Sequence, residues 1–223
     1  MKAIIWDMDG TITDTEFYWT QNIFRLLEHF GAPDPRGKDA PWFSTSTAAS
    51  LRAYLESSDN RLNMSYEECS IWCRNYIYTH IYAQGAPLKP HALETLEAAK
   101  AHGVPMCLLS ATEKQALRYT LNRLNLWRYF DFAETTCFRP LNKHNVELFE
   151  QSARRMGVET GDCLLVEDSL YSMKTGKQAG CTVWAIEDPK HVRDKEEIMA
   201  LADRYFVNHA AMSRAMREDF TVG

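Results

Sequence analysis

The most constraining feature of this sequence is its first apolar segment and the acidic turn that follows it. Four apolar residues, 3–6, run directly into Asp7 and Asp9, and Gly10 comes next. A short continuous apolar run of this kind is typical of a parallel strand covered on both faces. Side chains two residues apart in an extended chain point to the same side, so Asp7 and Asp9 should project together where the strand ends. Gly10 allows a sharp turn there, at the edge where open α/β sheets bind ligands.

The pair of carboxylates carries a chemical requirement of its own. Asp7 and Asp9 repel each other unless positive charge lies between them. A hard cation with oxygen ligands meets that requirement, and Mg²⁺ is the first candidate. The competing interpretation is an ordinary surface turn after a buried strand, because Asp and Gly are common turn residues.

The rest of the chain divides into a helical segment and an alternation of strands with helices. Residues 15–88 have apolar residues at helical spacing and no strand candidate, and a capping box at Ser65 and Glu68 begins their longest helix. Strands and helices then alternate, with strands expected at 105–109, 132–135, 163–166, 182–186 and 205–207. This alternation predicts an α/β fold with a doubly wound parallel sheet. We expect a core formed by residues 1–14 and 89–223, with residues 15–88 inserted as helices.

The segment Asp7-Met8-Asp9-Gly10-Thr11-Ile12 resembles the signature of the haloacid dehalogenase-like superfamily, which consists mostly of phosphatases and phosphomutases. The resemblance implies a Rossmann-like catalytic core with a helical cap at residues 15–88. It also implies that Asp7 attacks phosphorus to form an aspartyl phosphate, and that Asp9 is the general acid and base.

Two later strand ends carry polar residues that are similar to further motifs of this family. Ser110-Ala111-Thr112 is similar to the motif in which Ser or Thr binds the phosphoryl group, so Ser110 and Ala111 are the expected phosphate contacts. A hydroxyl and backbone N–H groups at a strand-to-helix turn form an anion site, although a plain helix N-cap is the alternative. Glu167-Asp168-Ser169 is similar to the acidic motif that completes the Mg²⁺ site. The implied metal ligands are Asp7, the backbone carbonyl of Asp9, and Asp168, with Glu167 bound to the ion or next to it.

Lys143 is the candidate for the cation that holds the nucleophile and the phosphate together. In relatives with this type of cap the Lys is commonly followed by Pro-x-Pro and a helix, whereas His144-Asn145-Val146 follows it here. Asn145 can cap the helix instead. Lys143 is therefore predicted to be catalytic and to bind phosphate. A solvated loop Lys is the alternative, and Arg139 is then the substitute.

Composition limits the partners and the compartment. The chain has 223 residues, of which 45% are hydrophobic and 25% charged, as in ordinary globular proteins. The net charge is −5 and no long basic run is present, so nucleic acid is not an expected partner. No apolar stretch reaches the roughly 18 residues of a membrane span. Cysteines in and beside predicted strands indicate free thiols in a reducing compartment, and we expect a cytoplasmic monomer or weak dimer.

These features together predict Mg²⁺-dependent hydrolysis of a small phosphorylated metabolite, such as a sugar phosphate. A sugar phosphomutase similar to β-phosphoglucomutase is the alternative within the same fold. A non-catalytic binding protein is the alternative from another class. Residues of the helical insertion that face the site would set specificity, and the candidates are Thr15, Glu16, Tyr18, Trp19 and the run 44–47.

Overall fold

The computed structural model describes residues 1–32, 47–137 and 139–220. The chain divides into two compact units, one comprising Met1–Asp14 with Gly85–Gly223 and the other comprising Thr15–Gln84. Each unit contains a hydrophobic cluster of its own. We therefore describe the two units separately, as the larger unit and the helical unit.

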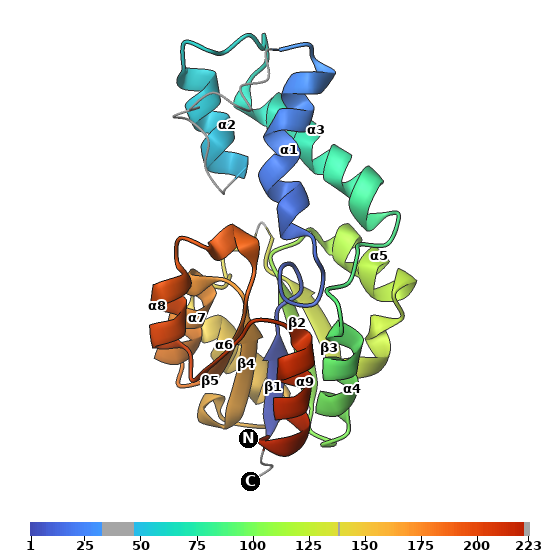
Figure 1. Cartoon of the computed structure of the whole chain (residues 1–223), viewed down its shortest axis with the longest axis vertical. Coiled ribbons are helices and arrows are strands. Elements are labelled where there is room, and N and C mark those ends of the chain that lie inside the picture. Colours follow the sequence, from blue (N-terminus) through green and yellow to red (C-terminus); the bar gives the residue numbers. More distant parts are fainter. Residues whose placement is uncertain (33–46, 138, 221–223) are drawn as a thin grey trace. The chain divides into compact units, whose positions relative to one another are not determined.

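The larger unit is built on one parallel sheet. Its strands, within the described ranges, follow the order β3-β2-β1-β4-β5-β6. In chain order they are β1 (Ala3–Trp6), β2 (Met106–Ser110), β3 (Phe132–Thr135), β4 (Cys163–Glu167), β5 (Thr182–Ile186) and β6 (Arg204–Phe206). β1 lies between β2 and β4, with Ile5 opposite Cys107 on one side and Leu165 on the other. The predicted parallel α/β sheet is confirmed, and the carboxyl ends of β1, β2 and β4 lie at the same edge (Figure 1).

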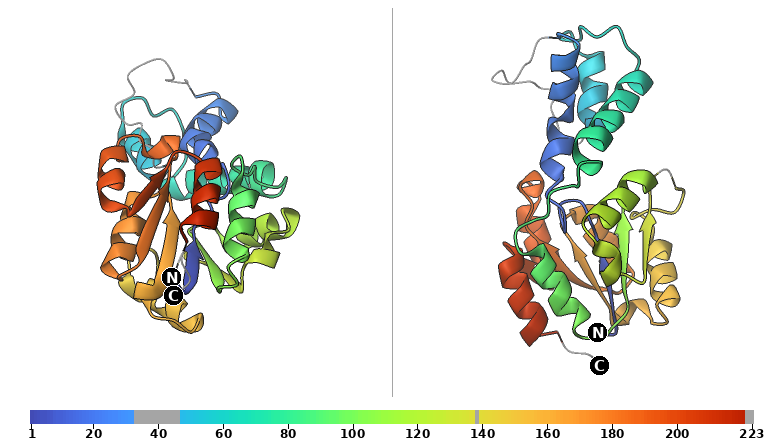
Figure 2. Two further views of the ribbon diagram at one scale, coloured as in Figure 1. Left: turned by 60° about the horizontal axis from the view of Figure 1, so that its bottom comes forward. Right: turned by 90° about the vertical axis from the view of Figure 1, so that its right-hand side faces the viewer.

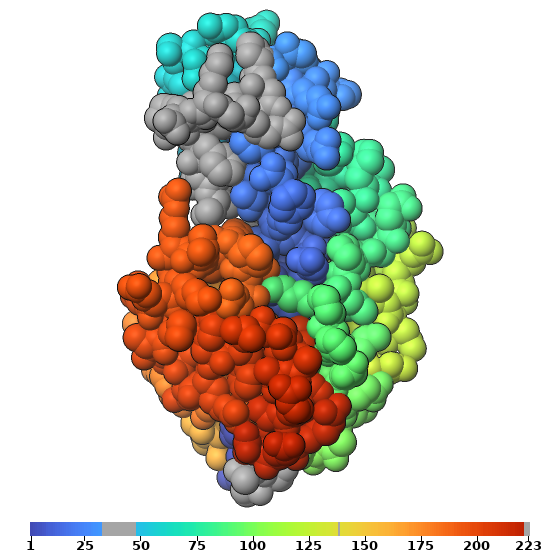
Figure 3. Space-filling view, viewed as in Figure 1, coloured from blue at the N-terminus to red at the C-terminus, as the bar shows by residue number. Residues whose placement is uncertain are grey.

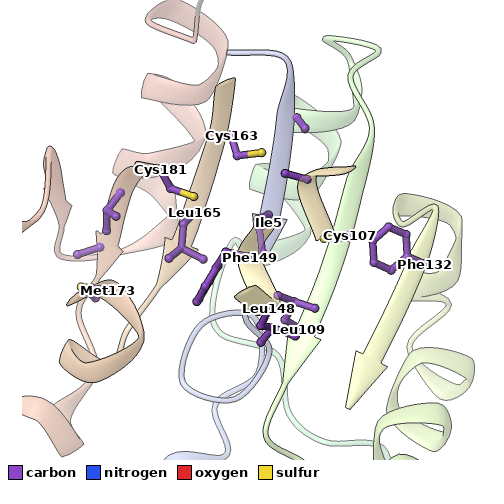
Figure 4. Close-up of a cluster of buried hydrophobic side chains, with 14 of the residues drawn as sticks. Ile5, Cys107, Leu109, Phe132, Leu148, Phe149, Cys163, Leu165, Met173 and Cys181 are labelled. Atoms are coloured by element: carbon purple, nitrogen blue, oxygen red, sulfur yellow. The ribbon is translucent and has the colours of Figure 1, made fainter. Parts of the chain in front are cut away.

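Helices cover both faces of this sheet. α6 (Val146–Arg155), α7 (Leu170–Gln178) and α8 (Lys195–Leu201) pack on one face, where Phe149 and Met173 join a cluster around Ile5 and Leu165 (Figure 4). α4 (Ala92–Lys100) and α9 (His209–Glu218) pack together over the other face (Figure 2), and their surfaces adjoin in Figure 3. Burial on both faces is why the central strands are continuous apolar runs.

One glycine sets how closely α7 approaches the sheet. A Cβ atom at Gly176 would lie 2.4 Å from Cδ2 of Leu165 on β4. Because a side chain there would displace the Leu165 side chain, Gly176 allows the helix after the acidic turn to pack tightly against the strand before it.

The sequence patterns located each strand of the sheet but missed one helix. α5 (Lys114–Arg123) and the other helices of the core agree with the predicted segments within a few residues. The short helix α8, between β5 and β6, was not predicted. Its only fully buried residue is Ile198, so it has no apolar stripe from which a helical period could be read.

The helical unit contains, within its described residues, only helices. They are α1 (Glu16–His29), α2 (Thr47–Glu56) and α3 (Tyr66–Ile77), and α3 continues into a π-helical turn at Tyr78–Tyr82. The predicted capping box is confirmed, because the N–H of Glu68 donates to Oγ of Ser65 at 3.2 Å and the N–H of Ser65 donates to Oε2 of Glu68 at 2.7 Å. Of the specificity candidates in the run 44–47, residues 44–46 lie outside the described residues.

The two segments that lead to and from the helical unit pair with each other. The N–H of Asp14 donates to the carbonyl of Pro87 at 2.8 Å, and the N–H of Lys89 donates to the carbonyl of Ile12 at 2.9 Å. Nζ of the buried Lys89 also lies 2.9 Å from Oδ2 of Asp188 in the loop after β5. The paired segments are thereby fixed to the loop after β5 in the larger unit.

The cysteines are free, and most of them are buried. Each of the six cysteines is a free thiol, and all except Cys137 are buried. Burial raises the pKa of Cys73 and of Cys163 to about 12, so these thiols stay protonated at neutral pH. No helix in the described ranges is long and apolar enough to cross a membrane.

Candidate active site

The structure brings the predicted site residues together at the carboxyl edge of the sheet. Asp7 directly follows β1, whereas Ser110 ends β2 and Glu167 ends β4. The N–H of Asp7 donates to the carbonyl of Val166 at 3.0 Å, which extends the pairing of β1 with β4 into the acidic segment. The three strand ends therefore place their polar side chains next to one another.

The turn after β1 carries Asp9 into a group of hydroxyls. Gly10 has a φ of 83° there, in the left-handed region that favours glycine. Oγ of Ser110 donates to Oδ2 of Asp9 at 3.2 Å, and the hydroxyl of Thr112 donates to the same oxygen. Oγ1 of Thr13 lies 3.5 Å from Oδ1 of Asp9. Asp9 is half-buried, so it remains accessible while its orientation is fixed.

The predicted phosphate contacts lie in the turn between β2 and α5. The buried Ser110 accepts the N–H of Thr112 on its Oγ at 2.9 Å. Ala111 lies between them and is exposed. Two hydroxyls and a backbone N–H group are thus gathered beside Asp9, and groups of these kinds can donate to an oxyanion.

Lys143 is buried between two carboxylates. Its ammonium donates to Oδ1 of Asp7 and, at 2.8 Å, to Oε1 of Glu167. Burial alone would lower the pKa of Lys143, but these two carboxylates outweigh it and raise that pKa well above its usual value. Burial likewise favours the neutral form of Glu167, yet the ammonium lowers the pKa of Glu167 to about 2. The side chain suggested as a substitute, Arg139, is exposed and lies 3.5 Å from Glu134.

The loop that carries Lys143 is held by hydrogen bonds within itself. The N–H of Asn142 donates to Oδ1 of Asn145 at 2.9 Å, and the N–H of His144 donates to Oδ1 of Asn142 at 3.0 Å. The expectation that Asn145 caps the following helix is therefore wrong. Asn145 precedes α6, but its side chain makes no cap hydrogen bond and closes the loop instead.

Asp7 is a buried carboxylate whose surroundings disfavour its charged form. Burial raises the pKa of Asp7 well above its usual value, and Glu167 and Asp168 add to the rise against the opposing charge of Lys143. Among the described residues, Oδ2 of Asp7 is buried and accepts no hydrogen bond. Oxygens of Asp7, Glu167 and Asp168 all lie within 4.8 Å of one another. Such a group of buried carboxylates fits a hard divalent cation.

Glu167, which ends β4, and Asp168, which follows it, have different hydrogen-bond partners. Oε2 of Glu167 accepts the N–H groups of Asp168 and Ser169 at 2.7 Å each, and its Oε1 accepts Lys143. Both oxygens of Glu167 are thus engaged by the protein. Asp168 instead accepts the Thr11 hydroxyl on Oδ1 at 3.2 Å. Asp7 and Asp168 belong to the group of carboxylates that could hold a metal ion, and Glu167 also supports Lys143 and the turn.

Sequence reasoning missed several side chains of the site. Thr11 and Thr112 stand inside the motifs already identified, but those motifs assign no contact to them. Nε2 of His191 lies 3.4 Å from Oδ2 of Asp168. His191 belongs to the loop after β5, where no residue pattern indicates that the chain returns to the acidic turn.

Comparisons with known proteins give a family, sequence relatives and a shared fold. A model of the family of haloacid dehalogenase-like hydrolases matches residues 1–180. A protein of Bacillus subtilis assigned as a phosphatase is 27% identical over 180 residues, which are 81% of this chain and 80% of the relative. The 6-phosphogluconate phosphatase of Escherichia coli K12 is 24% identical over 193 residues, 82% of this chain and 81% of the relative. A Thermotoga maritima protein assigned as a β-phosphoglucomutase has the same fold, with a TM-score of 0.79 at 21% identity over 99% of this chain and all of its own.

Proposed function

The chain belongs to the haloacid dehalogenase-like hydrolase family, and from that membership we propose that it is a Mg²⁺-dependent phosphatase acting on a small phosphate monoester. Its class as a hydrolase follows from the family, and phosphatase activity is supported by the relatives named as phosphatases. The observation that carries the proposal is the contrast between two neighbouring acids. Asp7 is buried against Lys143, and Asp9 is held by hydroxyl groups.

In the first step, the carboxylate of Asp7 attacks phosphorus and the bond from phosphorus to the leaving oxygen breaks. This forms an aspartyl phosphate and splits one difficult hydrolysis into two easier displacements. Asp9 donates a proton to the leaving oxygen, since it lies two residues from Asp7 on the same turn. The hydroxyls of Ser110 and Thr112 keep its carboxyl group in one orientation.

In the second step, water attacks the phosphorus of the aspartyl phosphate. Asp9 now takes a proton from that water, and the bond between phosphorus and Asp7 breaks to release inorganic phosphate. Asp7 and Asp9 thereby return to their starting protonation states. One acid can serve both steps because the leaving group and the water occupy the same side of the phosphorus in turn.

Charge compensation falls to Lys143 and to the metal site. The ammonium of Lys143 lies against Asp7 and stabilises the negative charge of the transferring group. Asp7, Asp168 and the backbone carbonyl of Asp9 would hold Mg²⁺, consistent with the buried oxygen of Asp7 that accepts no hydrogen bond within the described part of the chain. When bound, Mg²⁺ supplies Lewis-acid stabilisation of the phosphoryl oxygens.

The proposed substrate is a small phosphorylated metabolite such as a sugar phosphate. A relative named as 6-phosphogluconate phosphatase supports this class. We further propose that the helical unit acts as a cap that controls access to the site, with candidate specificity residues at the start of α1. Of these, Trp19 donates its indole N–H to the hydroxyl of Tyr82 at 2.9 Å within the helical unit, which favours a packing role for Trp19.

The experiment that tests the proposal is a phosphate-release assay on the purified chain. p-Nitrophenyl phosphate should be hydrolysed with Mg²⁺ and not with excess chelator. A panel of sugar phosphates and other phosphate esters would then identify the substrate class, and analysis of the products would separate hydrolysis from phosphoryl transfer within a sugar. Hydrolysis that persists in chelator, or no phosphate release from any ester, would contradict the proposal.

A further inference from the structure

A stacked pair of rings lies directly beside Lys143. The imidazole of His144 and the phenol ring of Tyr171 have centroids 4.4 Å apart and planes inclined by 26°, an offset-stacked arrangement. His144 follows Lys143 in the chain, and Tyr171 lies in the first turn of α7, three residues after Asp168. The stack therefore joins the loop of the essential cation to the helix that follows the acidic turn.

The hydrogen bonds within the loop are local, and Leu141 packs against the core cluster at its start. The bonds between Asn142, His144 and Asn145 close the loop upon itself. The side chain of Lys143 is anchored by Asp7 and Glu167, but the contact with Asp7 must change once Asp7 carries a phosphoryl group. The contact between the two rings involves no reacting atom, so it persists through both steps.

The electrostatic surroundings of Tyr171 agree with its position three residues after Asp168. Burial raises the pKa of Tyr171 to about 12, Lys143 opposes this rise, and Glu167, Asp7 and Asp168 add to it. The phenol thus experiences the charges of the predicted cation and of three acids of the site. Tyr171 contributes in turn to the raised pKa of Lys143. The phenol is therefore within reach of the charged groups, while 38% of Tyr171 is exposed and His144 is exposed as well.

We propose that His144 and Tyr171 are a positioning pair, which fixes Lys143 against Asp7 and the transferring phosphoryl group. The inference rests on the proposed function, and it assigns a task to the loop position where Pro-x-Pro is replaced by His144-Asn145-Val146. Neither ring touches the reacting atoms; the pair acts through Lys143. A shift of about 1 Å in such a group is enough to lower turnover on the order of 10²-fold.

Steady-state kinetics of a double-mutant cycle tests the pair, with p-nitrophenyl phosphate and saturating Mg²⁺. His144→Ala and Tyr171→Ala should each lower kcat by roughly 10- to 100-fold with little change in KM. The double variant should be no slower than the slower single variant, because each substitution already removes the whole contact. Tyr171→Phe keeps the ring and should restore most of the wild-type kcat.

The helical unit offers a matched control. His80 stacks on Tyr76 with centroids 4.2 Å apart and planes inclined by 20°, so His80→Ala breaks a pair of the same type at a residue to which no catalytic or specificity role is assigned. This variant should keep the wild-type kcat, and thermal unfolding should show that all variants are folded.

Three results would overturn the inference while leaving the proposed function standing: a wild-type kcat in Tyr171→Ala, a Tyr171→Phe variant as slow as Tyr171→Ala, or losses that multiply in the double variant. If the wild-type chain hydrolyses no ester, the proposed function fails and this inference fails with it.

Discussion

Asp7 and Asp9 stand two residues apart on one turn, yet their surroundings differ in kind. Asp7 is buried among charges, with Lys143 on one oxygen and Glu167 and Asp168 nearby. Asp9 is half-buried and accepts hydrogen bonds from the hydroxyls of Ser110 and Thr112. Gly10, with its positive φ, directly follows Asp9 and turns the chain at the end of the acidic segment.

The difference teaches how one short motif can supply two chemical roles. A carboxylate that must attack phosphorus benefits from an adjacent ammonium and a metal, which offset the repulsion between nucleophile and phosphate. A carboxyl group that must give and take a proton benefits from neutral partners that orient it and leave it accessible. Neighbouring acids with contrasting environments are the usual sign of divided acid, base and nucleophile roles. Substitutions of Asp7, Asp9 and Lys143 each alter one side of this contrast.

Loss of the nucleophile should have the largest effect. Asp7→Asn removes the attacking carboxylate and keeps the side-chain volume, so the fold should be retained while turnover falls by several orders of magnitude. Steady-state phosphate release, together with a thermal melt, measures both. Near-normal turnover in Asp7→Asn would show that the buried acid is not the nucleophile.

Loss of Asp9 should lower turnover less than loss of Asp7 does, and the size of the effect should depend on the leaving group. In Asp9→Asn we expect turnover to fall by roughly 10²–10⁴-fold. Sugar phosphates, whose leaving oxygens need a proton, should lose more in the first step than p-nitrophenyl phosphate. Burst and steady-state rates for both ester types provide the measurement. Equal losses in the burst phase would show that Asp9 is not the acid.

Substitution of Lys143 removes the positive charge beside Asp7 without altering Asp7 itself. Lys143→Ala should lower turnover by roughly 10²–10³-fold, as loss of a preorganised charge at a reacting group does. Arg139→Ala is the matched control, because Arg139 is exposed and paired with Glu134, and it should leave turnover unchanged. If the effects were exchanged, the phosphate-facing cation would have to be reassigned to Arg139.

The smallest effect concerns the hydrogen bond between His209 and the turn after β1. It is measured as a change in the free energy of unfolding. Nε2 of the buried His209 lies 2.7 Å from the carbonyl of Thr11. Burial lowers the pKa of His209 to about 4, helped by the charges of Lys89 and His91. Between about pH 6.5 and pH 4 the unfolded chain therefore binds a proton that the folded chain does not. Stability should fall as the pH falls through this window, by about 3 kcal/mol in total.

Urea denaturation at several pH values between 7 and 4.5 measures this contribution. Other acids also titrate at the lower end, so the informative quantity is the difference between the wild type and His209→Asn. The variant should lose the part of the pH dependence that lies between pH 6.5 and 5. An identical slope in both proteins would show that His209 is not held neutral in the fold.

The sequence was sufficient for features that depend on local pattern. Continuous apolar runs identified the strands, and because parallel strands share a carboxyl edge, the acids after β1 and β4 could be expected to meet. Lys143 was predicted from the resemblance to the lysine motif of the family. The structure places Lys143 between Asp7 and Glu167, and the chemical roles of these residues stay predictions.

Features that depend on side chains from distant segments could not be predicted. The hydroxyl of Thr112 reaches Asp9 across 103 positions of sequence, and the ring of His144 meets Tyr171 on a different element. Asn145 illustrates the same limit over a short range. Its type favours a helix cap, but a competing partner, the N–H of Asn142, takes its side chain.

The most direct test of the central claim is to trap the phosphoryl group on Asp7. In Asp9→Asn, p-nitrophenyl phosphate needs little help in the first step, whereas attack of water in the second step loses its general base. The aspartyl phosphate should therefore accumulate within a burst of p-nitrophenol, and mass spectrometry of the acid-quenched protein should find one phosphoryl group on the peptide that contains Asp7. Turnover by Asp9→Asn without any burst, or a phosphoryl group on a different residue, would contradict the account.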